Sequence, residues 1–188
     1  DLLLDQVMSL FLESFINLRT YLIEDATAIY KGDPAAKSVE EVVLSYVTFR
    51  AIVAYRIANF FYVKGFTLFA RMIAESSHQK TSIDIHPGAT IGRSFCIDHG
   101  IGVVIGETSV IGDHVKLYQG VTLGAFSVSK SDSDVKRHPT IENNVTIYAM
   151  STILGGDTII REGSIIGANV WLTKSVPKFS KIKLSTIS

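Results

Sequence analysis

The chain has 188 residues, enough for one mid-sized domain or two small ones, and its 18 basic and 18 acidic residues balance, which argues against nucleic-acid and membrane partners. The single cysteine, Cys96, excludes an intramolecular disulfide and fits a reducing compartment. No apolar run approaches the ~20 residues of a membrane span, and the first residues are acidic where a secretory signal is basic, so we expect a soluble, cytoplasmic protein.

Residues 1 to about 80 show the spacing of helices. Apolar residues recur every three or four positions over 2–25, as an amphipathic helix requires. After a Gly-Asp-Pro break, a second helical tract is predicted over 39–65, ended by Gly65, and a third over 66–80. We therefore predict an α-helical domain over 1–80.

From Ile83 onward the helical spacing disappears, and an aliphatic residue returns at every sixth position. Such a hexapeptide period predicts short strands stacked as a solenoid, in which each coil buries its aliphatic residues against the next coil. A sandwich would alternate with period two, and a helix would need period 3.6. The aliphatic positions are Ile85, Ile91, Ile97, Ile105, Ile111, Leu117, Leu123, Ile141, Ile147, Leu154, Ile160, Ile166 and Leu172.

The six-residue period fails in three places. The interval is eight over 97–105, eighteen over 123–141 and seven over 147–154. The second interval contains a polar stretch, which we predict to be an excursion loop near 125–139. Because a solenoid wall is otherwise regular, its irregularities are where side chains can reach a ligand. His99 lies in the first of them.

Four stretches identify the repeat more closely: DIHPGATIG, IDHGIGVVIGET, VTLG and RHPTI. In this order and spacing they resemble serine acetyltransferases, and the helical half is similar to the N-terminal domain of that family. The resemblance implies an α+β fold, with an N-terminal α-helical domain (1–80) followed by a left-handed parallel β-helix of hexapeptide repeats (81–188). It also implies a homotrimer, in many members paired through the helical domains into a hexamer.

The family resemblance implies an activity as well. Serine acetyltransferases move the acetyl group of acetyl-CoA, their cosubstrate, to the hydroxyl of L-serine, which gives O-acetyl-L-serine at the first step of cysteine biosynthesis. No metal is implied, and L-cysteine is an expected feedback inhibitor. Alternatives are a hexapeptide-repeat O-acetyltransferase for a sugar or another small hydroxyl acceptor, a β-helical carbonic anhydrase with three histidines on zinc, and a non-catalytic trimeric scaffold.

Acetyl transfer to a hydroxyl needs a base that takes the hydroxyl proton as the oxygen attacks. Histidine is the best-matched side chain near neutral pH, and a carboxylate on its other nitrogen fixes the tautomer. By match to the family motif, His99 is the general base and Asp84 its orienting carboxylate. The competing interpretations are a surface histidine beside a turn for His99 and a turn-forming residue for Asp84.

Serine carries both an ammonium and a carboxylate, so its pocket should offer acids and a cation. The resemblance assigns Asp33 and Asp98 to the amino end of the acceptor. It assigns Arg137 and His138 to the carboxylate, for which a guanidinium fork is well suited. Glu107 is placed in the same pocket. Turn chemistry alone would also explain Asp33, and Arg137 alone would be an ordinary loop arginine.

The sequence departs from the family where CoA is held. The loop after VTLG is longer and nearly free of glycine, and the usual Gly-x-Pro-Ala segment after the last coil is absent. The backbone along Gly124, Ala149 and Ala168 is our prediction for the groove of the CoA arm. Relatives end in an isoleucine peptide that docks in cysteine synthase, but here Ile187 is followed by Ser188, so this partnership stays open.

Overall fold

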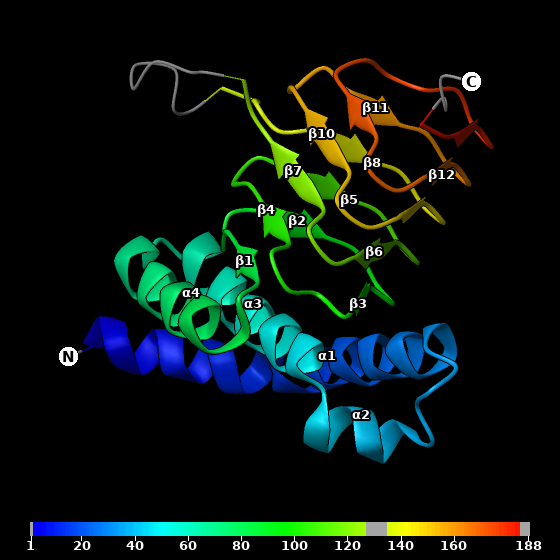
Figure 1. The fold of residues 1–188 in the computed structure, drawn as a ribbon. Coiled ribbons are helices and arrows are strands. Elements are labelled where there is room, and N and C mark those ends of the chain that lie inside the picture. Colours follow the sequence, from blue (N-terminus) through cyan, green and yellow to red (C-terminus); the bar gives the residue numbers. More distant parts are fainter. Residues whose placement is uncertain (1, 127–134, 185–188) are drawn as a thin grey trace.

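The computed structural model describes residues 2–126 and 135–184, so the middle of the predicted excursion loop, and Ile187 with Ser188, lie outside the described residues. Within these ranges a group of helices lies at one end, and short strands stack away from it (Figure 1). No helix among them combines the length and the apolar character that crossing a bilayer requires. The helices are α1 (Leu2–Gly32), α2 (Val39–Ser45), α3 (Val47–Val63) and α4 (Thr67–Thr81).

The second predicted helical tract is divided, which corrects the single helix expected over 39–65. Tyr46 takes an extended conformation, with ψ 122°, and separates α2 from α3. The break brings its phenol within 2.7 Å of the Asp33 carboxylate, to which it donates a hydrogen bond. Farther on, Gly65 ends the tract as predicted, with φ +87°, and α3 and α4 pack together as a helical hairpin.

The strands form three parallel sheets: up to β13 each strand pairs with the third strand before it, and β14 pairs with β12. Sheet A has the order β1-β4-β7-β10-β13, sheet B β2-β5-β8-β11, and sheet C β3-β6-β9-β12-β14. Each coil up to β12 gives one strand to each sheet, and the last coil adds β13 and β14 with only an isolated bridge between Val176 and Ile160 on sheet B. The described strands therefore build a triangular prism, a parallel β-helix. The strands are β1 (Asp84–Ile85), β2 (Thr90–Ile91), β3 (Cys96–Asp98), β4 (Val104–Ile105), β5 (Val110–Ile111), β6 (Lys116–Tyr118), β7 (Thr122–Gly124), β8 (Thr140–Ile141), β9 (Thr146–Ile147), β10 (Thr152–Leu154), β11 (Ile159–Ile160), β12 (Ile165–Ile166), β13 (Trp171–Leu172) and β14 (Lys181–Ile182).

The aliphatic positions of the repeat fill the interior of the prism, with one correction. Ile153, not Leu154, lies in register with Leu123 and Leu172, and it is fully buried. The six-residue period therefore continues to Ile153, and the irregular interval follows it, where Gly155 takes φ +99°. The other predicted positions are buried, apart from the partly buried Leu172.

A buried ion pair joins the helices to the first coil. Asp25 of α1 is 0% exposed and accepts two hydrogen bonds from the Arg56 guanidinium of α3, at 3.0 and 3.1 Å. The backbone N–H of Phe95 donates to the same carboxylate at 2.8 Å, and Arg56 also donates to the Ile91 carbonyl at 2.6 Å. These contacts fix α1 and α3 on the β-helix, and with them the residues that follow α1.

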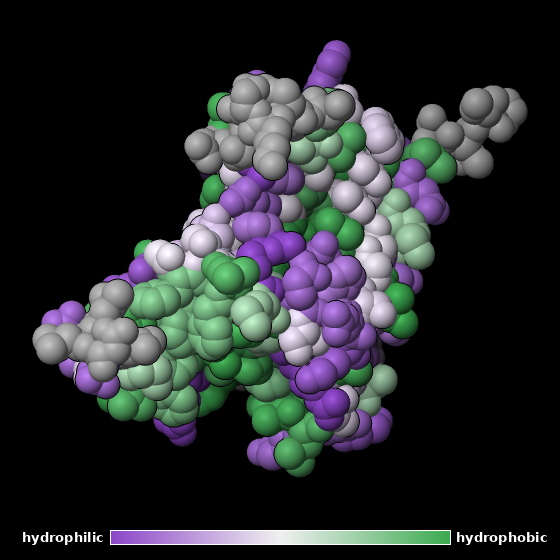
Figure 2. All heavy atoms as spheres, turned by 90° about the vertical axis from the view of Figure 1, so that its left-hand side faces the viewer, coloured by the Kyte–Doolittle hydropathy of each residue, from purple (hydrophilic) through white to green (hydrophobic). Residues whose placement is uncertain are grey.

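Apolar side chains gather over the helical end of the molecule (Figure 2). A large apolar surface of this kind is typical of a contact surface between proteins. The role of residues 1–80 in oligomerisation stays a prediction. Exposed apolar side chains on α1 and α4 include Met8, Leu12, Phe15, Ile16, Leu68, Phe69 and Met72.

Candidate functional site

The predicted polar site residues fall into two clusters at different corners of the prism. The first lies where sheet C passes into sheet A, and we call it the His99 cluster. The second lies where sheet A passes into sheet B, and we call it the Arg137 cluster. The His99 cluster comprises Asp33, Tyr46, Asp98, His99 and Lys116, and the Arg137 cluster comprises Tyr62, Glu107, Thr108, Lys136, Arg137 and His138.

His99 occupies the long corner between β3 and β4, where the sequence predicted an irregular coil. Its backbone is left-handed, with φ 58°, and its side chain is 72% exposed, outside the prism. Gly100 follows with φ 81°, and a Cβ there would come within 2.7 Å of Thr48 on α3, so the corner fits tightly against the helices. The left-handed conformation itself recurs at other corners, such as His114 with φ 58°, and does not mark a site.

Asp98 is the carboxylate beside His99. Its Oδ1 lies 3.8 Å from His99 Nε2, and its Oδ2 lies 2.8 Å from Lys116 Nζ. The same ammonium donates to the Gly32 carbonyl at the end of α1, at 2.6 Å. Burial works against the charged form of Lys116, but the hydrogen bonds with Asp98 and Tyr118 and the nearby negative charge together prevail and raise the pKa of the lysine above its ordinary value.

Asp33 reaches the same corner from the turn after α1. Its Oδ2 accepts the Tyr46 hydroxyl at 2.7 Å, and its Oδ1 accepts the backbone N–H of Ala35 at 2.8 Å. These bonds, with smaller contributions from His99 and Lys116, hold the pKa of Asp33 below its ordinary value. The Tyr46 bond to this carboxylate also raises the pKa of Tyr46 to about 12. Asp33 therefore stabilises its own turn and also contributes a carboxylate to the His99 cluster.

The Arg137 cluster is built around the Glu107 carboxylate. Arg137 forms an ion pair with it, and Tyr62 of α3 donates a hydrogen bond at 2.6 Å. Burial of Glu107 favours its neutral form, but the bonds from Tyr62 and Arg137 prevail and lower its pKa. The same bond raises the pKa of Tyr62 to about 12. The predicted neighbourhood of Glu107 and Arg137 is therefore present.

His138 is held as a neutral ring with a defined tautomer. It is 8% exposed, and its Nδ1 accepts hydrogen bonds from the Thr108 backbone N–H at 3.1 Å and from the Thr108 hydroxyl at 2.9 Å. Burial, and then the charges of Arg137 and Lys136, lower the pKa of His138 to about 4. The ring proton therefore sits on Nε2, which lies over Gly106, where a Cβ would approach to 2.0 Å.

We expect His138 to stay neutral at pH values where the unfolded chain binds a proton at this residue. As pH falls below the ordinary value of 6.5, the unfolded state takes up the proton first, because the pKa in the folded state is about 4. The stabilisation that neutral His138 gives the folded state is therefore complete above pH 6.5, and it is lost as pH falls toward 4. NMR of the imidazole resonances in folded and urea-unfolded protein measures both values, and a folded value near 6.5 would contradict the assignment.

The structure does not join Asp84 to His99 within one chain. Asp84 begins β1 in sheet A, and no hydrogen bond or ion pair links it to His99 in the part of the chain that is described. The charge of Asp84 acts on His86, where it opposes the burial that lowers the pKa of that histidine. The role of Asp84 as orienting carboxylate stays a prediction.

The three residues predicted to border CoA are also divided between the corners of the two clusters. Ala149 and Ala168 follow β9 and β12, so both lie at the corner where sheet C passes into sheet A, on the side of His99. Gly124 ends β7 at the other corner, on the side of Arg137. Their role in binding CoA stays a prediction.

Sequence reasoning did not identify Lys116, Tyr46, Tyr62 or Thr108 as site residues. Lys116 occupies an outward strand position, where a charged residue looks like an ordinary solvent-exposed side chain of the coil. Cys96 is buried under α1, with a pKa raised to about 12 by burial, and His114 is exposed.

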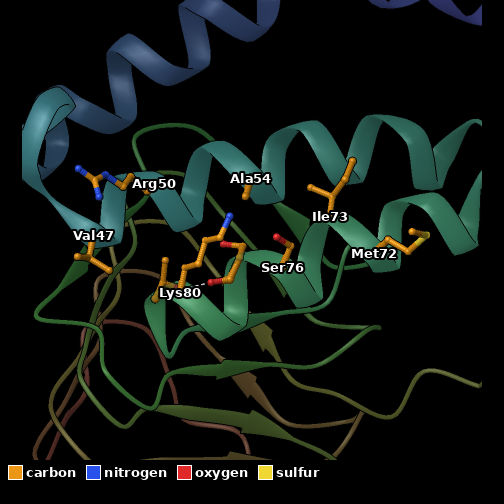
Figure 3. A pocket seen from close by; sticks show the side chains of 9 residues that line it. Val47, Arg50, Ala54, Met72, Ile73, Ser76 and Lys80 are labelled. Atoms are coloured by element: carbon orange, nitrogen blue, oxygen red, sulfur yellow. Dashed lines mark hydrogen bonds between the residues drawn. The ribbon is translucent and has the colours of Figure 1, made fainter.

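A cavity of about 450 Å³ lies apart from both clusters, between α3 and α4 (Figure 3). Its lining includes apolar side chains such as Ala54 and Ile73 and the cations Arg50 and Lys80, and none of the predicted site residues. Over residues 2–126 and 135–184, no group of three or more His, Cys, Asp or Glu side chains is placed to hold a metal ion.

Comparison with known sequences gives one family. No family model matches the chain. The chain is 50% identical over 182 residues to the plasmid serine acetyltransferase of Synechococcus elongatus, a match that covers 94% of this chain and 57% of that protein. It is 48% identical over 161 residues to the serine acetyltransferase of Bacillus subtilis, covering 86% of this chain and 72% of that protein. The chain therefore spans little more than half of the first relative.

Solved structures agree with this result. Serine acetyltransferase isoform 3 of Entamoeba histolytica, solved with cysteine, matches with a TM-score of 0.91 and 39% identity over 98% of this chain and 64% of its own. The Neisseria gonorrhoeae enzyme, solved with serine, matches at 0.84 and 31%, over 94% and 70%. A further serine acetyltransferase, solved with CoA, matches at 0.83 and 30%, over 94% and 71%.

The likeness confirms the predicted α+β fold, in which a helical N-terminal region precedes a left-handed parallel β-helix. It also covers both clusters, because the matches extend over nearly all of the chain. With 48% identity to a relative of which it spans 72%, the chain belongs to the serine acetyltransferase family.

Proposed function

We propose that the chain transfers the acetyl group of acetyl-CoA to the hydroxyl of L-serine, giving O-acetyl-L-serine and CoA at the first step of cysteine biosynthesis. The observation that carries this proposal is the exposed imidazole of His99 beside Asp98 and Asp33, outside the coil. A base there faces an acceptor in solution, whereas a histidine inside the prism would only pack. The reaction and the single reduced cysteine fit a cytoplasmic location.

In the proposed reaction, neutral His99 takes the proton of the serine hydroxyl as its oxygen attacks the thioester carbonyl. The C–O bond of the ester forms, the C–S bond of the thioester breaks, and the imidazolium returns its proton to the departing thiolate. No acyl-enzyme is needed. The Asp98 carboxylate, 3.8 Å from Nε2, stabilises the positive charge that His99 acquires.

Binding both the ammonium and the carboxylate of serine requires side chains from both clusters. Asp33 and Asp98 offer carboxylates for the ammonium, while the Arg137 guanidinium and the Nε2–H of His138 suit the carboxylate. These groups occupy different corners of one prism. We therefore propose a homotrimer in which the His99 cluster of one copy faces the Arg137 cluster of the next, since a head-to-tail interface that closes into a ring presents unlike corners to each other.

Complexes of related enzymes support these ligands. The structural relatives were solved with serine, with cysteine and with CoA. Cysteine has the ammonium and carboxylate of serine, so we propose that it competes for the same groups and acts as an inhibitor. The geometry favours an amino acid over a sugar acceptor, because a sugar has no use for two carboxylates at one end and a guanidinium at the other.

An assay of thiol release from acetyl-CoA tests the proposed function. With purified protein, we expect L-serine to support turnover, homoserine to support less, and sugars with isolated hydroxyls to support none. A chelator should leave the rate unchanged. Preference for a sugar would establish the alternative acetyltransferase, and absence of turnover with every acceptor would favour a non-catalytic scaffold.

A further inference from the structure

One of the two carboxylates assigned to the acceptor ammonium already has a cation bound to it. Lys116 Nζ lies 2.8 Å from Asp98 Oδ2, and the side chains are 17% and 11% exposed. Register explains the contact: Lys116 begins β6 opposite Cys96 of β3, and Asp98 lies two residues further along β3 on the same outward face. The Lys116–Asp98 ion pair therefore follows from the register of two neighbouring coils.

The ammonium is held on the carboxylate from more than one side. Lys116 Nζ donates to the Gly32 carbonyl at 2.6 Å and lies 4.5 Å from the centre of the Tyr118 ring. Gly32 immediately precedes Asp33, so the cation sits close to both carboxylates of the His99 cluster and contributes to the lowered pKa of Asp33. With His99 neutral, the cluster carries one net negative charge in place of two.

We propose that Lys116 is a specificity-determining residue, a built-in counter-ion that lowers the affinity of the site for the ammonium of an amino acid. The proposal rests on the function proposed above. An incoming ammonium that uses Asp98 Oδ1 meets a like charge on the other oxygen of the same carboxylate. In a partly buried site such repulsion changes affinity by about tenfold, even after solvent screening. L-serine and L-cysteine should be affected alike, since both present the same group.

Neutral substitutions at Lys116 test the proposal through the split between KM and kcat. In Lys116→Met and Lys116→Gln we expect the KM for L-serine to fall about tenfold with kcat within about twofold, whereas Lys116→Arg keeps the wild-type KM. Gln retains a donor for the Gly32 carbonyl, so this variant separates the loss of the charge from the loss of the hydrogen bond to Gly32. Lys178→Met, which removes an exposed lysine from Glu162, is the matched control and should change neither constant.

Glycerate, which carries a hydroxyl in place of the serine ammonium, provides the second measurement. Its KM should not fall when the lysine is neutralised, so the preference for serine over glycerate rises about tenfold. A KM for L-serine that is unchanged or raised in both neutral variants would overturn the proposal and assign Lys116 a tethering role only.

Calorimetry of L-serine binding without acetyl-CoA separates this inference from the function on which it rests. Tighter binding in Lys116→Met and Lys116→Gln supports the counter-ion even where turnover is not measured. Absence of turnover by the wild-type protein would overturn the proposed reaction, whereas equal affinities in wild type and both variants would overturn only the role of Lys116.

Discussion

Replacement of His99 by Gln is expected to lower turnover of acetyl-CoA and L-serine by about 10²–10⁴-fold, because the hydroxyl then loses its proton acceptor. The side chain is 72% exposed, so the free energy of unfolding should change by less than about 0.5 kcal/mol. Thiol release measured at saturating L-serine, together with urea unfolding, separates the chemical loss from a folding defect.

His114→Gln is the matched control for this prediction. His114 is exposed and has φ 58°, the same value as His99, but it lies at the corner between sheets B and C, away from both clusters. We expect it to keep wild-type turnover. If His99→Gln retained wild-type turnover while remaining folded, the imidazole would not be the base, and the proposed chemistry would have to be abandoned.

Replacement of Arg56 by Met is expected to cost about 3–5 kcal/mol of unfolding free energy, because it leaves the Asp25 carboxylate buried without its cation. Asp25 is 0% exposed, and burial already raises its pKa against the opposing effect of Arg56. The carbonyls of Ile91 and Gly92 would also lose their guanidinium donors. Urea or thermal unfolding of the wild-type and variant proteins measures the difference.

Two further variants make this prediction specific. Arg161→Met removes the exposed Arg161–Glu142 pair, at 3.3 Å, and should cost no more than about 1 kcal/mol. The double variant Asp25→Leu/Arg56→Met should recover part of the loss, since it removes the unpaired buried charge. Equal costs for Arg56→Met and Arg161→Met would show that the pair does not secure the helices on the first coil.

Most of the fold could be predicted from the period of the aliphatic residues, because burial inside a stacked coil constrains one position in six. The break at Tyr46 could not be predicted, because it depends on a hydrogen bond to Asp33, thirteen residues earlier. The shift from Leu154 to Ile153 was missed for a related reason: both are large aliphatic residues, and only the register with neighbouring coils distinguishes them.

The site was predictable in composition but not in assembly. The family resemblance assigned Asp98 and Asp33 to the acceptor beside His99, and the structure brings these three together. The resemblance also assigned Arg137 and His138 to the acceptor, yet the structure places them at another corner. Spacing along a solenoid determines the coil and the corner of a residue, but not the copy of the chain against which it lies.

Mixing two inactive variants tests most directly whether the His99 cluster of one copy and the Arg137 cluster of the next form the acetyl-transfer site. His99→Gln and Arg137→Gln are each expected to be nearly inactive at low L-serine. Refolded together in equal amounts, they should recover about a quarter of wild-type activity, because one shared site in four then joins an intact His99 to an intact Arg137. If the mixture shows only the average of the two variants, the site does not lie between copies, and the account is contradicted.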